Sequence, residues 1–117
     1  MRLNHINLTV TDVPAAAAFL TIYFGLISHG GNAGMAVLRD TAGDDGMVLT
    51  LMKANPLKVH YPETFHVGFF VASRDDVNAV YASMRADGMQ VDEPSDTGHS
   101  YGFYVTAPGG FLVEVGA

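Results

Sequence analysis

Hydrophobic and polar residues alternate along several short stretches of the chain, and this alternation predicts β-strands. Residues 3–10 are the clearest case, because apolar side chains occupy one face while His5 lies on the opposite, polar face. An N-cap signal at Asp12 and a stop signal at Gly25 then predict a helix over residues 15–24. Further strands are predicted at residues 26–31, 34–40 and 47–53.

The same order of elements returns in the second half of the chain. A strand is predicted at residues 64–72, a helix at 76–87, and three more strands at 89–92, 100–106 and 111–115. Two pairs of residues align the halves: His5 with His66, 61 residues apart, and Thr50 with Glu114, 64 residues apart. The 117 residues are therefore predicted to form one domain. Its two strand-helix-strand-strand-strand modules span about residues 1–54 and 64–117, with a linker at about 55–63.

The last predicted strand carries a single charged residue, Glu114, between two valines. Side chains alternate between the faces of a strand, so Glu114 points away from both neighbours. On a solvent face it would be an ordinary surface acid, whereas on the concave face of a curved sheet it would need a partner. Alternation alone leaves both interpretations open.

His5, His66 and Glu114 each interrupt an otherwise apolar strand at a prominent position in its module. Two imidazoles and one carboxylate are the donor set that a divalent first-row metal takes in a catalytic site, where vacant positions hold water and substrate. A strand histidine that hydrogen-bonds to the backbone is the simpler interpretation of each histidine taken alone. The three together favour a metal site.

Three segments carry a resemblance to a known family: LNHINLTVTD at residues 3–12, FHVGFFV at 65–71 and FYVTAPGGFLVEV at 103–115. The sequence resembles the vicinal oxygen chelate superfamily of glyoxalase I, extradiol dioxygenases, fosfomycin-resistance transferases and bleomycin-binding proteins. The resemblance implies an α+β fold in which two βαβββ modules form a cupped, mixed eight-stranded sheet. It also implies a homodimer and a divalent ion (Zn, Ni, Mn or Fe) held by His5, His66 and Glu114, with Glu114 as the catalytic residue.

The sequence departs from the pattern of glyoxalase I at one ligand position. That enzyme has a fourth ligand, a glutamate in the last strand of the first module, and the repeat places Thr50 there. Threonine is a poor metal ligand, so Thr50 is expected to line the pocket instead. His99, Tyr101 and Tyr104 are further candidates for pocket-lining residues.

Composition excludes several other classes of function. The net charge is −6, with 6 basic and 12 acidic residues, which argues against a nucleic-acid partner. The chain has no cysteine, so metal ligands must be His, carboxylate or backbone oxygen. No apolar run is long enough to cross a bilayer, and a soluble, cytoplasmic protein is expected.

The function predicted from these residues is that of a metal-dependent enzyme acting on a small, oxygen-chelating substrate. The chemistry would be of the lyase, dioxygenase or thiol-transferase type, and no single branch of the superfamily matches every feature of the sequence. The alternative is a metal-free protein that sequesters a small hydrophobic or cationic molecule in the same cup. A third possibility is a dimerising scaffold whose pocket is vestigial.

Overall fold

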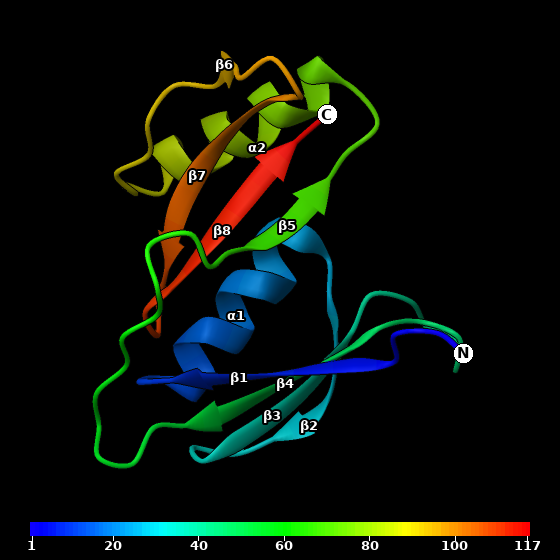
Figure 1. The fold of residues 1–117 in the computed structure, drawn as a ribbon, viewed down its shortest axis with the longest axis vertical. Helices are drawn as coiled ribbons and strands as arrows, with labels where there is room; N and C mark the ends of the chain where they lie inside the picture. Colours follow the sequence, from blue (N-terminus) through cyan, green and yellow to red (C-terminus); the bar gives the residue numbers. More distant parts are fainter. The chain divides into compact units, whose positions relative to one another are not determined.

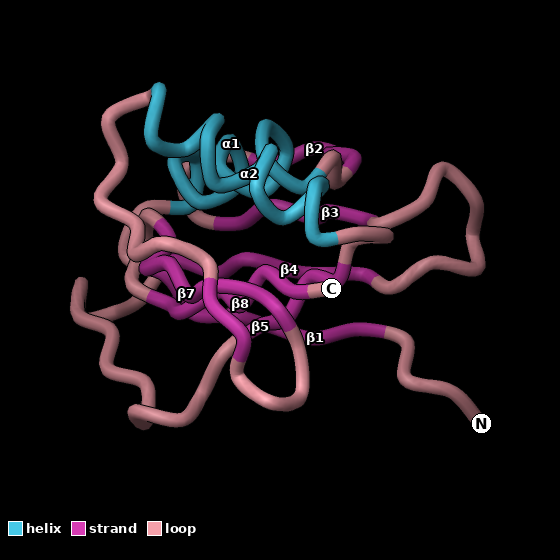
Figure 2. Tube along the Cα trace, turned by 90° about the horizontal axis from the view of Figure 1, so that it is seen from above, coloured by secondary structure: helices cyan, strands magenta, loops and turns pink.

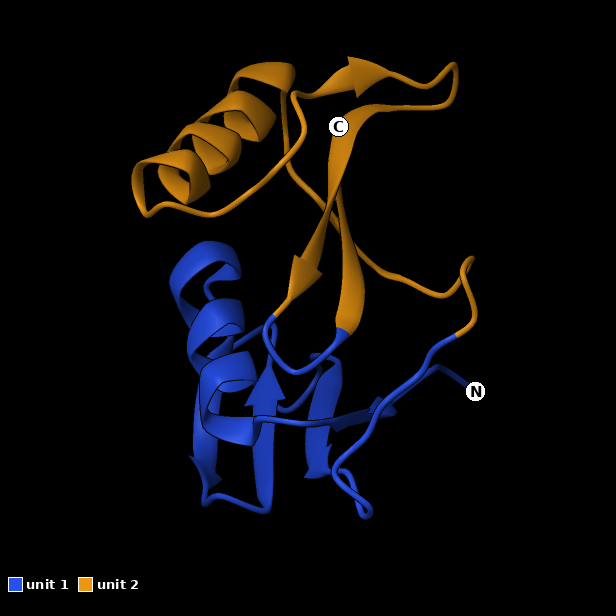
Figure 3. Ribbon diagram, turned by 90° about the vertical axis from the view of Figure 1, so that its left-hand side faces the viewer, with its two compact units in different colours: residues 1–61, 108–110 blue, residues 62–107, 111–117 orange.

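The computed structural model describes residues 1–117, which form two compact units. Unit 1 comprises residues 1–61 and 108–110, and unit 2 comprises residues 62–107 and 111–117 (Figure 3). Each unit contains one four-stranded sheet and one helix. The predicted α+β class is confirmed.

Unit 1 has the strand order β1-β4-β3-β2 (Figure 1). β1 and β4 run parallel, and the other neighbours run antiparallel. The sheet is therefore mixed, as predicted. Its elements are β1 (His5–Val10), α1 (Val13–Phe24), β2 (Ile27–Gly31), β3 (Met35–Arg39) and β4 (Val48–Lys53).

Unit 2 repeats this topology with the strand order β5-β8-β7-β6. Again the first pair is parallel and the others are antiparallel. The duplication expected from the sequence is present in the topology. The elements are β5 (Val67–Phe70), α2 (Arg74–Ala86), β6 (Ser95–Asp96), β7 (Tyr101–Ala107) and β8 (Phe111–Gly116).

In each unit the helix covers one face of the sheet and leaves the other face open (Figure 2). In unit 1 the covered face buries Leu8, Leu38 and Leu51, all fully inaccessible or nearly so. In unit 2 it buries Val113 and Val115, the neighbours of Glu114. The alternation that buries these residues directs the polar residues between them to the open face.

Both helices begin directly after their N-cap residues, two residues before the predicted starts at residues 15 and 76. The Asp12 carboxylate accepts a hydrogen bond from the Ala15 N–H, and the Ser73 hydroxyl accepts one from the Asp76 N–H. Gly25 ends α1 in the left-handed conformation, with φ of 66°.

Two predicted strands of the second module differ from the structure. The strand expected at residues 89–92 is absent, and the edge strand is the two-residue β6 instead. Two acidic residues and Pro94 follow Val91, and these residue types disfavour strand structure. The strand expected to begin at residue 64 begins at Val67, because the Phe65 N–H donates to the Pro62 carbonyl in a turn.

Neither helix is long and apolar enough to cross a membrane. The joining of the two sheets into one cupped, eight-stranded sheet remains a prediction.

Candidate functional site

The open face of unit 2 brings a histidine and a glutamate together. His66 lies directly before β5, and Glu114 lies in β8, the strand that pairs with β5. The His66 Nε2 atom is 3.2 Å from the Glu114 Oε2 atom, and the two side chains are 37% and 18% exposed. The pair is therefore accessible to a ligand while the carboxylate is largely shielded from water.

The hydrogen-bond partner of the other ring nitrogen of His66 indicates which tautomer of the ring contacts Glu114. Its Nδ1 atom lies 3.0 Å from the Thr64 carbonyl oxygen, which can only accept a hydrogen bond. Nδ1 therefore carries the hydrogen, and in the neutral ring Nε2 presents a lone pair to the carboxylate. Two acceptors that face each other require a proton or a cation between them. A backbone carbonyl on the far nitrogen is also the usual support of a metal-binding histidine.

The spacing of the two acceptors fits a shared metal ion. Ligand atoms about 2.1 Å from one ion, at angles of about 90–110°, lie roughly 3.0–3.4 Å apart. The observed Nε2–Oε2 distance is 3.2 Å. The distance between the two side chains of unit 2 therefore matches that of two adjacent ligands on one ion.

Tyr104 of β7 holds the second oxygen of the carboxylate. Its hydroxyl donates to the Glu114 Oε1 atom over 2.9 Å. Its ring meets the His66 ring edge to face, with centroids 5.5 Å apart. The hydrogen bond to Glu114, together with burial and the charge of that carboxylate, raises the pKa of the Tyr104 phenol. Tyr104 therefore stays protonated at neutral pH and leaves Oε2 as the free oxygen of Glu114.

A small cavity opens beside these side chains. Its volume is about 340 Å³, and Glu63, Thr64, His66, Tyr104 and Leu112 line it. Leu112 was missed in the sequence, although strand alternation places it on the same face as Glu114. Gly68 pairs with Glu114, and a Cβ atom at Gly68 would make an ordinary contact of 3.6 Å with the Oε2 atom.

Unit 1 carries the register counterparts of these residues. Asn7 pairs with Thr50 as Gly68 pairs with Glu114, which makes His5 the counterpart of His66. Thr50 also pairs with Val37, whose counterpart is Tyr104. His5 is exposed on the open face, and its Nδ1 atom lies 3.2 Å from the Asn4 side-chain oxygen. Thr50 is half-buried beside it in the sheet.

The remaining candidates lie elsewhere. The Tyr101 hydroxyl donates to the Asn78 side chain on α2, and the Arg74 guanidinium stacks 4.8 Å above the Tyr101 ring. Tyr101 thus faces the helix, while Tyr104 faces the open side of the sheet. His99 is exposed in the loop between β6 and β7.

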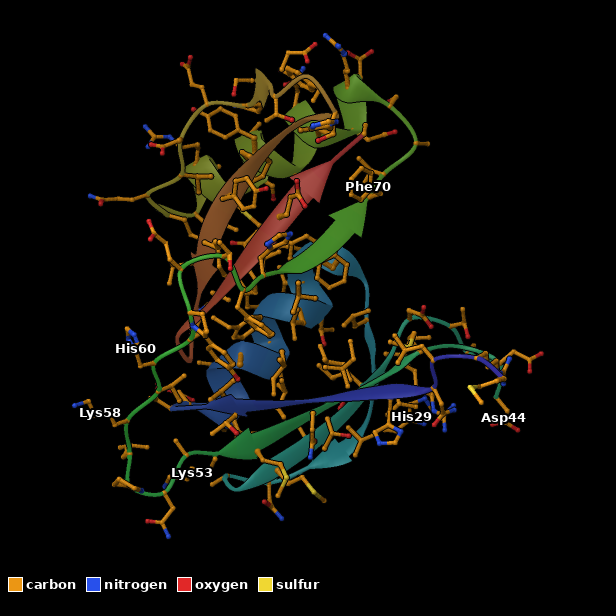
Figure 4. The ribbon with its side chains drawn as sticks, viewed as in Figure 1. His29, Asp44, Lys53, Lys58, His60 and Phe70 are labelled. Carbon is orange, nitrogen blue, oxygen red and sulfur yellow. The ribbon has the colours of Figure 1, made fainter.

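No group of three or more His, Asp or Glu side chains that could hold a metal ion gathers within either unit. Figure 4 shows two further histidines of unit 1, His29 on β2 and His60 after β4, at opposite ends of the unit. Within unit 2, no third His, Asp or Glu side chain joins His66 and Glu114 in such a group.

The sequence matches the Glyoxalase/Bleomycin resistance protein/Dioxygenase superfamily over residues 2–115. The chain belongs to this superfamily. The resemblance seen in the three sequence segments is thereby confirmed. Comparison with curated proteins gave no match.

Solved structures with the same fold include a possible glyoxalase from Bacillus cereus. It is 45% identical, with a TM-score of 0.88, and the alignment covers 100% of this chain and 99% of that one. Two more distant structures share the fold. One is lactoylglutathione lyase from Agrobacterium tumefaciens, with 23% identity, a TM-score of 0.73 and coverage of 98% and 92%. The other is the fosfomycin resistance protein FosX from Listeria monocytogenes, with 20% identity, a TM-score of 0.78 and coverage of 100% and 93%.

Proposed function

We propose that this protein is a metal-dependent enzyme that acts on a small substrate with two adjacent oxygen atoms. The supporting observation is the geometry of the His66–Glu114 pair. The His66 Nε2 atom lies 3.2 Å from the Glu114 Oε2 atom, a separation suited to two ligands of one divalent ion. Zn, Ni, Mn and Fe all accept this nitrogen–oxygen donor set.

His5 is the third ligand of the proposed site. It holds in unit 1 the register position that His66 holds in unit 2, and its side chain is exposed on the open face. The ligand comes either from the same chain or from a second copy in a homodimer. A homodimer also gives the open sheet faces of both units a partner to bury against.

Three residues of unit 2 have separate roles in the proposed site. Thr64 orients the His66 ring, Tyr104 holds one oxygen of Glu114, and the other oxygen of Glu114 faces His66. A bound divalent ion would supply Lewis acidity that stabilises negative charge on the chelated oxygens of the substrate. The cavity of about 340 Å³ is suited to a small molecule.

Metal analysis of protein purified without chelator tests the proposal. We expect about one divalent ion per chain, with His66→Ala and Glu114→Gln each lowering the affinity about a hundredfold or more. His60→Ala is the matched control, since His60 lies in the segment after β4, and it should retain the ion. Stoichiometric metal in His66→Ala would contradict the proposed site. A metal-free protein that nevertheless gains thermal stability with a small ligand would favour the sequestering alternative.

A further inference from the structure

A second and larger cavity of unit 2 lies next to the proposed metal site. Its volume is about 710 Å³, and its polar lining comes from Arg85, Gln90, Asp92, Tyr104 and Thr106. Tyr104 and Leu112 line both cavities, so the two adjoin along one face of β7 and β8. We call this larger cavity the β7 groove. No step of the proposed chemistry uses it.

The β7 groove exists because the edge of β7 is uncovered there. β6 pairs only with Tyr101 and Gly102, and no strand covers the rest of that edge. Tyr101 exchanges backbone hydrogen bonds with Ala117, on the β8 side. By alternation, the N–H and C=O groups of Tyr104 and Thr106 point the other way, into the groove. No backbone partner satisfies them there.

Unit 1 has no such opening. The counterpart of Thr106 is Arg39, because Arg39 pairs with Val48 as Thr106 pairs with Leu112. Arg39 is covered by Ile27 of the five-residue β2. The groove is thus confined to the unit that also carries Glu114 and Tyr104.

Two opposite charges line the β7 groove without neutralising each other. Arg85, in the last turn of α2, forms no ion pair, and neither does Asp92. A ligand that carries only a negative charge would be repelled by Asp92. A ligand that carries only a positive charge would be repelled by Arg85. A ligand that carries both charges satisfies both side chains, and the free N–H and C=O groups of β7 complement its carboxylate and ammonium.

We propose that the β7 groove is a binding subsite for an amino-acid group, with its carboxylate at Arg85 and its ammonium at Asp92. This subsite takes the amino-acid end of the substrate while the other end reaches Glu114, an assignment that rests on the proposed function. The binding of an amino acid in the groove does not depend on a metal. Gln90 and the backbone of β7 position the group between the two charges.

Titration of the metal-free, ¹⁵N-labelled full-length protein with glycine tests the subsite. We expect saturable shifts of the backbone amide signals of Tyr104 and Thr106. Arg85→Gln and Asp92→Asn should each weaken glycine binding roughly three- to fivefold, the range for exposed charge pairs. Arg2→Gln makes the same charge change in unit 1 and should leave the affinity unchanged. Arg2 is exposed and pairs only with Asp45.

Three results would overturn the subsite: no saturable shift at these amides, unchanged glycine affinity in Arg85→Gln, or equal shifts with acetate and methylammonium supplied as separate ions. Equal shifts with the separate ions would mean that Arg85 and Asp92 each bind an ion independently. Glycine binding in a His66→Ala variant separates this inference from the metal proposal. Retained glycine binding with lost metal would support both, whereas retained glycine binding in a protein that never binds metal would refute the metal site alone.

Discussion

The two units share one topology but differ in the residues at matching register positions. Both carry a histidine at the start of the open face, His5 in unit 1 and His66 in unit 2. Unit 2 adds a glutamate where unit 1 has Thr50, and a tyrosine where unit 1 has Val37. It also shortens the edge strand from five residues to two, which opens the β7 groove.

This comparison distinguishes the positions that stabilise the fold from the positions that form the proposed site. The buried positions stay apolar in both units, because each sheet must pack against its helix. The open-face positions are free to diverge, and the glutamate and the tyrosine of the proposed site occur in unit 2 alone. At the matching position of the first strand unit 1 retains a histidine, His5, which is the third ligand of the proposed site.

The largest expected effect comes from removing the acid that distinguishes unit 2. Glu114→Gln preserves shape but loses the anionic oxygen that faces His66, so affinity for Zn²⁺ should fall about a hundredfold or more. Thr50→Val changes the counterpart in unit 1 and should alter affinity less than about twofold. Isothermal titration of both variants measures this. Equal losses of Zn²⁺ affinity in the two variants would show that Glu114 has no role in metal binding that Thr50 lacks.

A second difference concerns backbone packing. Gly102 pairs with Gly116 at the position where unit 1 pairs Met35 with Met52. A Cβ atom on Gly102 would collide with the Val115 carbonyl oxygen. Gly102→Ala should therefore lower the free energy of unfolding by about 2 kcal/mol.

Chemical denaturation provides the measurement, with Met35→Ala as the control. Met35 is 44% exposed, and its truncation should cost well under about 1 kcal/mol. A fully stable Gly102→Ala variant would show that β7 and β8 can separate more easily than their register indicates.

The hydroxyl of Tyr104 should matter less than the carboxylate that it holds. Tyr104→Phe removes the hydrogen bond to Oε1 and frees Glu114 to rotate, so metal affinity should fall about tenfold. Tyr101→Phe makes the same chemical change on the helix side of β7 and should leave metal affinity unchanged. If the two variants bind metal equally well, Tyr104 does not position Glu114.

The smallest effect is the pH dependence of the β6 edge. The N–H of Gly98 and the Arg74 guanidinium lower the pKa of Asp96, so the folded state favours the charged carboxylate. Its stabilisation is therefore complete above the ordinary carboxyl range and is lost as the pH falls through the lowered pKa. Thermal unfolding of wild type and Asp96→Asn should differ slightly at pH 7 and converge as the pH falls through the lowered pKa of Asp96. A difference in unfolding temperature that grows as the pH falls would contradict the lowered pKa of Asp96.

Alternation and capping signals predicted the order of the elements because both are local, whereas the mixed sheet was implied by the family resemblance. His66 and Glu114 were found because a polar side chain inside an apolar strand is a strong signal. The strand expected at residues 89–92 failed because short apolar runs do not distinguish strand from loop. Alternation places Tyr101 and Tyr104 on opposite faces of β7, but only the pairing register shows that Tyr104 shares the face of Glu114, since a shift of one residue exchanges the two faces.

Two further features lay beyond sequence patterns. The Thr64 carbonyl that orients His66 belongs to the backbone, and nothing in the residue type reveals it. The β7 groove depends on where a neighbouring strand stops, which is set by pairing rather than by residues of the groove itself. Both features require coordinates.

X-ray absorption of the protein loaded with one equivalent of Zn²⁺ tests the central claim most directly. The account predicts two imidazole ligands and oxygen donors around the ion, with one imidazole lost in His5→Ala and one lost in His66→Ala. A single imidazole in the wild type, or a spectrum unchanged by His5→Ala, would contradict the account.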